Sequence, residues 1–98
     1  MKLYLVHCGF YDLDLLDGVF EQHVNLFIAA ESFEEARVAV KLHPDFQRKK
    51  MHVDGLQEVE AVSGYRIGLE RDSTLDGATR VHSSRHRDLA PKSMQPIK

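Results

Sequence analysis

The chain of 98 residues lacks several features that would identify a functional class at once. Its single cysteine, Cys8, cannot form an internal disulfide framework, which favours a reducing, cytoplasmic location. No apolar run approaches the roughly 18 residues of a membrane-spanning helix, and the short apolar start lacks the small-residue cleavage site of a signal peptide. Neither charge dominates, since 13 Lys and Arg oppose 15 Asp and Glu. Composition therefore indicates neither a polyanion nor a membrane as a partner.

Familiar catalytic and ion-binding motifs are also missing from the sequence. There is no Gly-x-Ser-x-Gly nucleophile turn, no phosphate-binding glycine loop and no dinucleotide-binding fingerprint. Asp12, Asp14 and Asp17 resemble the start of a calcium loop. An EF-hand loop starting at Asp12 would need glycine at position 17 and glutamate at position 23, where this chain has Asp17 and His23. We therefore interpret these aspartates as part of a solvated loop.

Charge and hydrophobicity divide the chain near residue 71. Residues 1–71 carry 8 Lys and Arg against 12 Asp and Glu, whereas residues 72–98 carry 5 against 3 and contain few hydrophobic side chains. We predict an α+β domain over residues 1–71 and a polar, basic, flexible tail over residues 72–98. Because the tail has no aromatic platform for bases, we do not expect it to bind nucleic acid.

Hydrophobic patterning predicts four strands and one helix in the order ββαββ. The strands are expected over residues 3–9, 21–30, 51–61 and 65–70. Ser32 and Glu35 form a capping box that begins the helix, and Pro44 ends it by His43. Residues 3–9 are apolar on both faces, which is typical of a central strand. We predict a four-stranded antiparallel sheet in the order 2-1-3-4, with the helix packed on one face.

The last two predicted strands need a turn around Ser63 and Gly64. A three-residue loop over residues 62–64 places Ala61 opposite Tyr65 and pairs apolar residues, so we predict this register rather than a two-residue turn. A single helix covers only one face of such a sheet. We therefore expect a homodimer, or the tail, to cover the second face.

Histidines and carboxylates gather at one end of the predicted sheet. Glu21 and His23 lie two positions apart on one strand, as do His52 and Asp54 on another, so each pair shares a face. In the order 2-1-3, the end of the first strand, with His7, lies between the two pairs. Imidazole and carboxylate together suit zinc or another transition metal, or a general acid–base pair. Glu21, His23, His52 and Asp54 are therefore candidate metal ligands, and half-buried residues that bond one another are the alternative.

Four short blocks resemble a known protein family. The blocks are Met1-Lys2-Leu3 opening a strand that closes at Gly9, Glu21-Gln22-His23, His52-Val53-Asp54 and Gly64-Tyr65-Arg66-Ile67. Over residues 1 to about 70, the chain is similar to the small bacterial proteins catalogued as domain of unknown function 1543. This resemblance implies a small α+β domain, and it implies no particular activity.

Two classes of function fit the sequence. We favour a non-catalytic binding or regulatory module that acts as a dimer, because no complete catalytic set can be identified from spacing. The alternative is a small metal-binding protein or hydrolase-like enzyme that uses the histidine–carboxylate cluster. Cys8 beside a histidine is a further candidate nucleophile, although a buried cysteine acting as a small hydrophobic residue fits better. The sequence identifies no cofactor.

Overall fold

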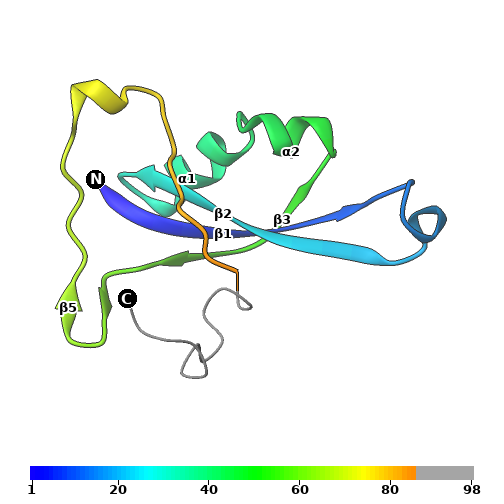
Figure 1. Ribbon diagram of the computed structural model, residues 1–98, viewed down its shortest axis with the longest axis horizontal. Coiled ribbons are helices and arrows are strands. Elements are labelled where there is room, and N and C mark those ends of the chain that lie inside the picture. The colour runs from blue at the N-terminus through cyan, green and yellow to red at the C-terminus, as the bar shows by residue number, and fades with distance from the viewer. Residues whose placement is uncertain (86–98) are drawn as a thin grey trace, which may run out of the picture.

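The structure is a computed structural model that describes residues 1–85, so the predicted tail is described only in part. The helices and strands follow the order β1 (Lys2–Tyr11), β2 (Glu21–Ala30), α1 (Phe33–Val40), α2 (Pro44–Arg48), β3 (His52–Glu58), β4 (Ala61–Val62) and β5 (Tyr65–Arg66). Short 3-10 helices occupy Leu16–Gly18 and Ser73–Leu75. The predicted α+β class is confirmed (Figure 1).

β1 is the centre of a three-stranded antiparallel sheet in the order β2-β1-β3. Figure 1 shows α1 and α2 on the same side of this sheet. Tyr4, Val6 and Cys8 alternate along β1 toward that side and are fully buried. The doubly apolar pattern of residues 3–9 therefore predicted the central strand correctly.

The hydrophobic core is small and lies between the sheet and α1. Its eight buried residues are Tyr4, Val6, Cys8, Leu26, Ala30, Ala36, Val40 and Met51. β1 and β2 supply five of them and α1 supplies two, so the helix is held mainly by the first two strands. A core of this size leaves each large member with a substantial share of the stability.

The start of α1 shows the cap that the sequence predicts, with one difference. The Ser32 hydroxyl oxygen accepts a hydrogen bond from the backbone N–H of Glu35 at 3.1 Å. The Glu35 carboxylate accepts from the backbone N–H of Glu31 at 3.0 Å, one residue before the expected partner. Both bonds involve backbone donors at the helix N-terminus, where such groups have no partner within the helix itself.

Pro44 begins a second helix. α1 ends at Val40, before the predicted limit, but α2 starts at Pro44, and the sequence analysis did not predict this second helix. Proline suits the first position of a helix because its missing N–H needs no partner there. The Nδ1 atom of His43 accepts a hydrogen bond from the backbone N–H of Asp45 at 3.1 Å and caps α2.

The predicted fourth strand does not join the main sheet. Within the described residues, β5 pairs only with β4, in a separate two-stranded sheet, and Tyr65 lies opposite Val62. The three-residue loop was therefore wrong, because Ser63 and Gly64 alone form the turn, at φ 53° and 86°. Positive φ at both central residues is the geometry that matches strand twist in a two-residue hairpin. This hairpin is exposed, so matching apolar residues gave no energetic preference for the other register.

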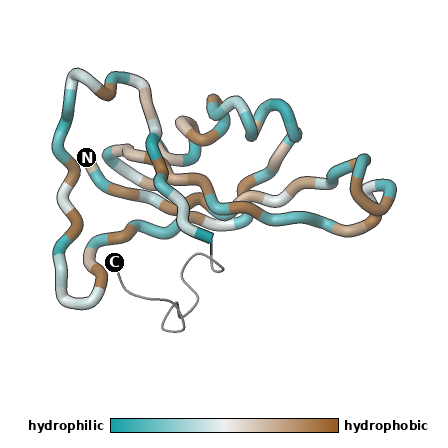
Figure 2. The backbone as a smooth tube through the Cα atoms, in the orientation of Figure 1, coloured by the Kyte–Doolittle hydropathy of each residue, from teal (hydrophilic) through white to brown (hydrophobic). Residues whose placement is uncertain are grey.

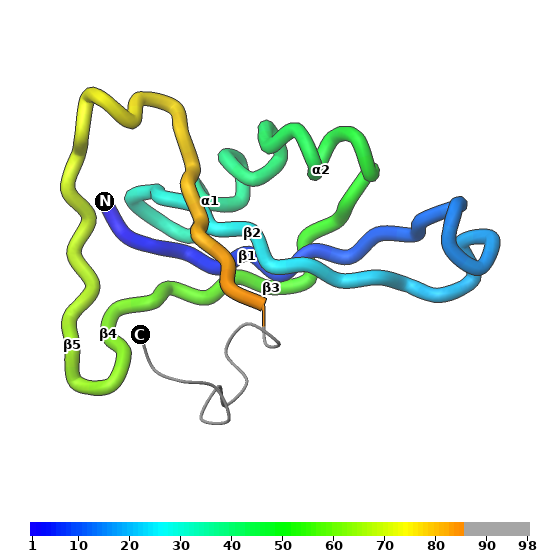
Figure 3. The backbone as a smooth tube through the Cα atoms, in the orientation of Figure 1, coloured from blue at the N-terminus to red at the C-terminus, as the bar shows by residue number. Residues whose placement is uncertain are grey.

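The chain beyond β5 runs back toward the N-terminus. Residues 68–71 line a cavity together with Met1 and Ala29. Figure 3 shows the segment after β5 passing the N-terminus, where β1 begins. Figure 2 shows hydrophobic positions along the segment after β3, which runs past the end of the sheet near the N-terminus. In the described part of the chain, no helix has the length and hydrophobicity needed to cross a bilayer.

Candidate metal centre

The sheet face opposite α1, which we call the open face, carries the candidate ligands. Leu3, Leu5, His7 and Gly9 alternate onto this face along β1, opposite the set that is buried against α1. Gly9 pairs with His23 of β2 on one side and with His52 of β3 on the other, as the 2-1-3 order predicted.

Asp54 is the bulged residue of β3. His7 of β1 pairs with Gly55 and Cys8 pairs with Val53, so Asp54 is an extra residue between the two pairs. Asp54 lies on the open face with His52, and the bulge then shifts the alternation by one position. As a result, the next residue on the open face after Asp54 is Gly55 and not Leu56. Val53 and Leu56 both pack against the core.

The four candidate ligands form one connected cluster, within which Glu21, His52 and Asp54 each offer a ligand atom within 4.8 Å of the other two. The Nε2 atom of His23 lies 2.7 Å from Oε1 of Glu21 and 3.3 Å from Oδ2 of Asp54. The Nε2 atom of His52 lies 2.9 Å from Oε2 of Glu21 and 3.2 Å from Oδ1 of Asp54. Each carboxylate therefore divides its two oxygens between the two imidazoles. The sequence predicted the membership of this cluster, and the structure brings all four side chains together.

This arrangement places more acceptors around each imidazole than one proton can serve. A ring Nε2 carries one hydrogen at most, yet each Nε2 here faces oxygens of two different carboxylates. Zn²⁺ at bond lengths of about 2.0–2.1 Å separates neighbouring tetrahedral ligands by about 3.3 Å. Both Asp54 contacts are close to this spacing, whereas the two Glu21 contacts, at 2.7 and 2.9 Å, are shorter and have the length of hydrogen bonds. The side chains are 30–46% exposed, so an ion could enter from solvent without unfolding the sheet.

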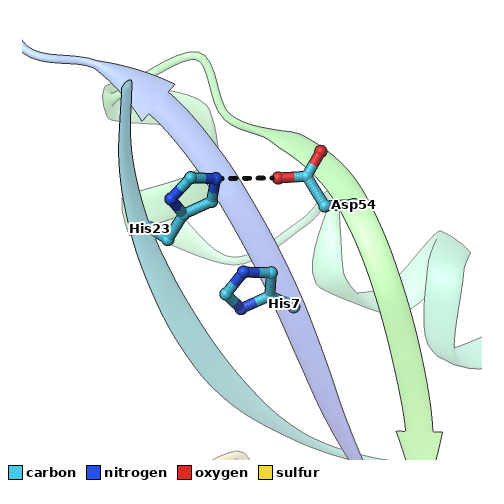
Figure 4. A group of neighbouring side chains, drawn as sticks. All are labelled: His7, His23 and Asp54. Carbon is cyan, nitrogen blue, oxygen red and sulfur yellow. Dashed lines mark ion pairs between the residues drawn. The ribbon is translucent and has the colours of Figure 1, made fainter. Parts of the chain in front are cut away.

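His7 forms a second layer beside the cluster. Its ring stacks on the ring of His23, with centroids 4.9 Å apart and planes within 5°. Its Nδ1 atom lies 2.8 Å from the side-chain oxygen of Asn25, which fixes the ring when that nitrogen donates. Figure 4 shows His7 beside His23, with Asp54 across from the His23 ring. His7, His23 and Asp54 each offer a ligand atom within 4.8 Å of the others.

Because Gly9 has no side chain, His52 and Asp54 can occupy the space above it. A Cβ atom at this position would lie 2.6 Å from Nε2 of His52 and 2.8 Å from Oδ2 of Asp54. Both distances are too short for real contacts, so any other residue at position 9 displaces these side chains. Glycine inside a strand often marks a close approach of this kind, and this signal was available in the sequence.

Comparison with protein families supports the resemblance seen in the sequence. Residues 18–69, more than half of the chain, match the family described as Domain of Unknown Function (DUF1543). The chain belongs to this family. No curated protein and no solved structure matched the chain. The matched range of the DUF1543 domain contains Glu21, His23, His52 and Asp54, whereas His7 and Gly9 lie before it.

Cys8 of the DUF1543 domain does not have the surroundings of a nucleophile. It is fully buried on the core side of β1, and its thiol lies 3.7 Å from the carbonyl oxygen of Val6. Burial raises the pKa of the Cys8 thiol, and the negative charge of Asp54 raises it further. Since the thiolate is the reactive form, both effects lower the reactivity of Cys8 at neutral pH. The hydrophobic interpretation of this residue fits the structure.

Proposed function

We propose that this DUF1543 domain binds a divalent transition-metal ion, with zinc as the reference ion, on the open face of its sheet. The observation that carries the proposal is the shared contact of two carboxylates with two imidazoles, at 2.7–3.3 Å. Glu21, His23, His52 and Asp54 would supply two nitrogen and two oxygen ligands. Neutral imidazole and carboxylate are ligands that Zn²⁺ and its neighbours accept.

The charges of the site also suit a dication. Two carboxylates balance the charge of one divalent ion, and both histidines then bind as neutral imidazoles. Without an ion, the same four side chains can stabilise one another through the contacts of each Nε2 atom with Glu21 and Asp54. A structural ion-pair network of that kind is the competing explanation, and metal binding distinguishes the two.

We expect metal-depleted, untagged protein to bind one Zn²⁺ per chain in a calorimetric titration. The double variant His23→Ala/His52→Ala removes both nitrogen ligands and should abolish this binding. The matched control is His43→Ala/His82→Ala, which removes two histidines that lie outside the cluster and should leave binding unchanged. If folded wild-type protein, checked by circular dichroism, takes up no zinc, nickel or cobalt, the cluster is an ion-pair network and the proposal is wrong.

A dimeric binding module is the second candidate function, and it also concerns the open face. Within the described residues, the helices cover only the opposite face, and Phe27 is 45% exposed next to the strand that carries Leu3 and Leu5. A second copy of the chain that stacks on this apolar part would bury it. We propose a homodimer through this face, with the histidine–carboxylate cluster at its edge.

Sedimentation velocity tests the dimer. We expect a species of twice the chain mass of 11.2 kDa, and we expect Phe27→Asp to convert it to a monomer because a charge would be buried in the interface. Phe20→Asp is the matched control, since Phe20 is 59% exposed but precedes β2 outside the open face. A wild-type monomer over the whole accessible concentration range would contradict this proposal.

A further inference from the structure

A groove on the helix side of the β3 edge adjoins the candidate metal centre. It has a volume of about 350 Å³ and is lined by Arg37, Lys41, Phe46, Met51, His52 and Val53. We infer that this groove binds a small amphipathic anion, in which a phosphate or carboxylate group is attached to an aromatic or apolar body.

The charged wall of the groove provides the first argument. Arg37 lies in the last turn of α1 and Lys41 directly follows the helix, four residues later. Within residues 1–85, neither side chain forms an ion pair with a carboxylate. Like charges four residues apart on a helix repel each other, and an oxyanion between them would remove this cost. Arg37 can also hold a carboxylate or phosphate through two parallel hydrogen bonds.

The remaining lining of the groove provides the second argument. Phe46 of α2 packs against the core and also lines the groove, together with Val53 of β3 and the largely buried Met51 just before β3. An inorganic anion would use only the charged wall. A ligand with an aromatic body would also cover this surface, and the sulfur atom of Met51 makes favourable contacts with aromatic rings. The groove therefore fits an organic anion better than a bare one.

The position of His52 provides the third argument. This residue lines the groove and also belongs to the histidine–carboxylate cluster. A ligand in the groove is thus next to a residue that would bind the metal. This link rests on the proposed function, whereas the anion site itself does not require a metal. With zinc bound, the added positive charge should strengthen anion binding.

The experiment titrates phenyl phosphate and benzoate into metal-depleted protein and follows backbone amide shifts by NMR, with phenol as the uncharged comparison. We expect saturable shifts at Arg37, Lys41 and His52 for the two anions and none for phenol. Arg37→Gln/Lys41→Gln should weaken anion binding at least tenfold. The matched control Lys2→Gln/Arg66→Gln removes the same charge from sites away from the groove and should leave it unchanged. The stronger of the two anions identifies the preferred headgroup.

Three results would overturn the inference. Shifts that avoid the groove would place the anion elsewhere, and equal losses in both double variants would show general charge attraction. If neither anion binds saturably, the groove is not an anion site. Arg37 and Lys41 would then serve only to stabilise the C-terminal end of α1. Repeating the titration with zinc separates this proposal from the metal site. If zinc does not bind but the groove shifts persist, the metal proposal fails and the anion site stands.

Discussion

Replacing Gly9 by alanine is expected to abolish metal binding while leaving the fold intact. The added Cβ would lie 2.6 Å from Nε2 of His52 and 2.8 Å from Oδ2 of Asp54, so two of the four ligands must move. Losing even one outer partner of a metal site typically costs about 10- to 100-fold in affinity, so displacing two ligands should cost at least about 100-fold. Zinc titration by calorimetry measures this loss.

The stability of the same variant should hardly change. The atoms that the new Cβ meets are the far ends of side chains that are 46% and 34% exposed, and both can rotate toward solvent. Glycine in a strand is also destabilising by roughly 0.5–1 kcal/mol relative to alanine, which offsets part of the disturbance. Urea denaturation should therefore give a midpoint close to that of the wild type.

Gly55 offers a matched control for this prediction. It follows Asp54 in β3, pairs with His7, and a Cβ atom there would meet nothing within 4 Å. Gly55→Ala should keep both stability and zinc affinity. If Gly9→Ala binds zinc as tightly as Gly55→Ala does, the ion is not held where the four side chains meet.

Truncating Tyr4 is expected to destabilise the domain more than any surface change. The side chain is fully buried at the centre of the eight-residue core, and its ring contacts that of Phe33 edge-on at 5.1 Å between centroids. Removing a buried aromatic ring typically costs about 3–5 kcal/mol, out of a total stability of roughly 5–15 kcal/mol for a domain. Tyr4→Ala should therefore shift the urea midpoint strongly downward, or leave the chain partly unfolded in buffer.

Tyr4→Phe separates packing from polarity at the same position. The hydroxyl of Tyr4 is buried and has no hydrogen-bond partner among the described residues. Because an unsatisfied buried polar group costs about 1–3 kcal/mol, the phenylalanine variant should be at least as stable as the wild type. A large loss in Tyr4→Phe, or no loss in Tyr4→Ala, would contradict this view of the core.

The strand order could be predicted because burial dictated it. Residues 3–9 are apolar on both faces, which is typical of a central strand, and β1 does pair with β2 on one side and β3 on the other. The same order brought Glu21, His23, His52 and Asp54 to one end, so membership of the cluster followed from topology. Alternation correctly placed His52 and Asp54 on the same face, but the sequence pattern gave no sign of the bulge that shifts the alternation after Asp54.

The errors fall where burial gives no preference. The hairpin that follows β3 is exposed, so its register depends on the left-handed backbone of Ser63 and Gly64 rather than on apolar pairing. α2 was overlooked because Pro44 was interpreted only as a stop, although proline also suits the first turn of a helix. Asn25, which holds His7, carries no sequence signal that distinguishes it from any other exposed polar strand residue.

The bulge in β3 adds a carboxylate to the open face without changing which residues of the strand reach the core. Asp54 is one residue more than a regular ladder requires, since Val53 and Leu56 reach the core only because the extra residue shifts the phase of the strand. A strand one residue shorter, with Asp54 absent, would bring both hydrophobic residues to the core by simple alternation. The packing of β3 against the core therefore does not depend on Asp54. Deleting this one residue would remove one carboxylate from the cluster and leave the core contacts of Val53 and Leu56 in place.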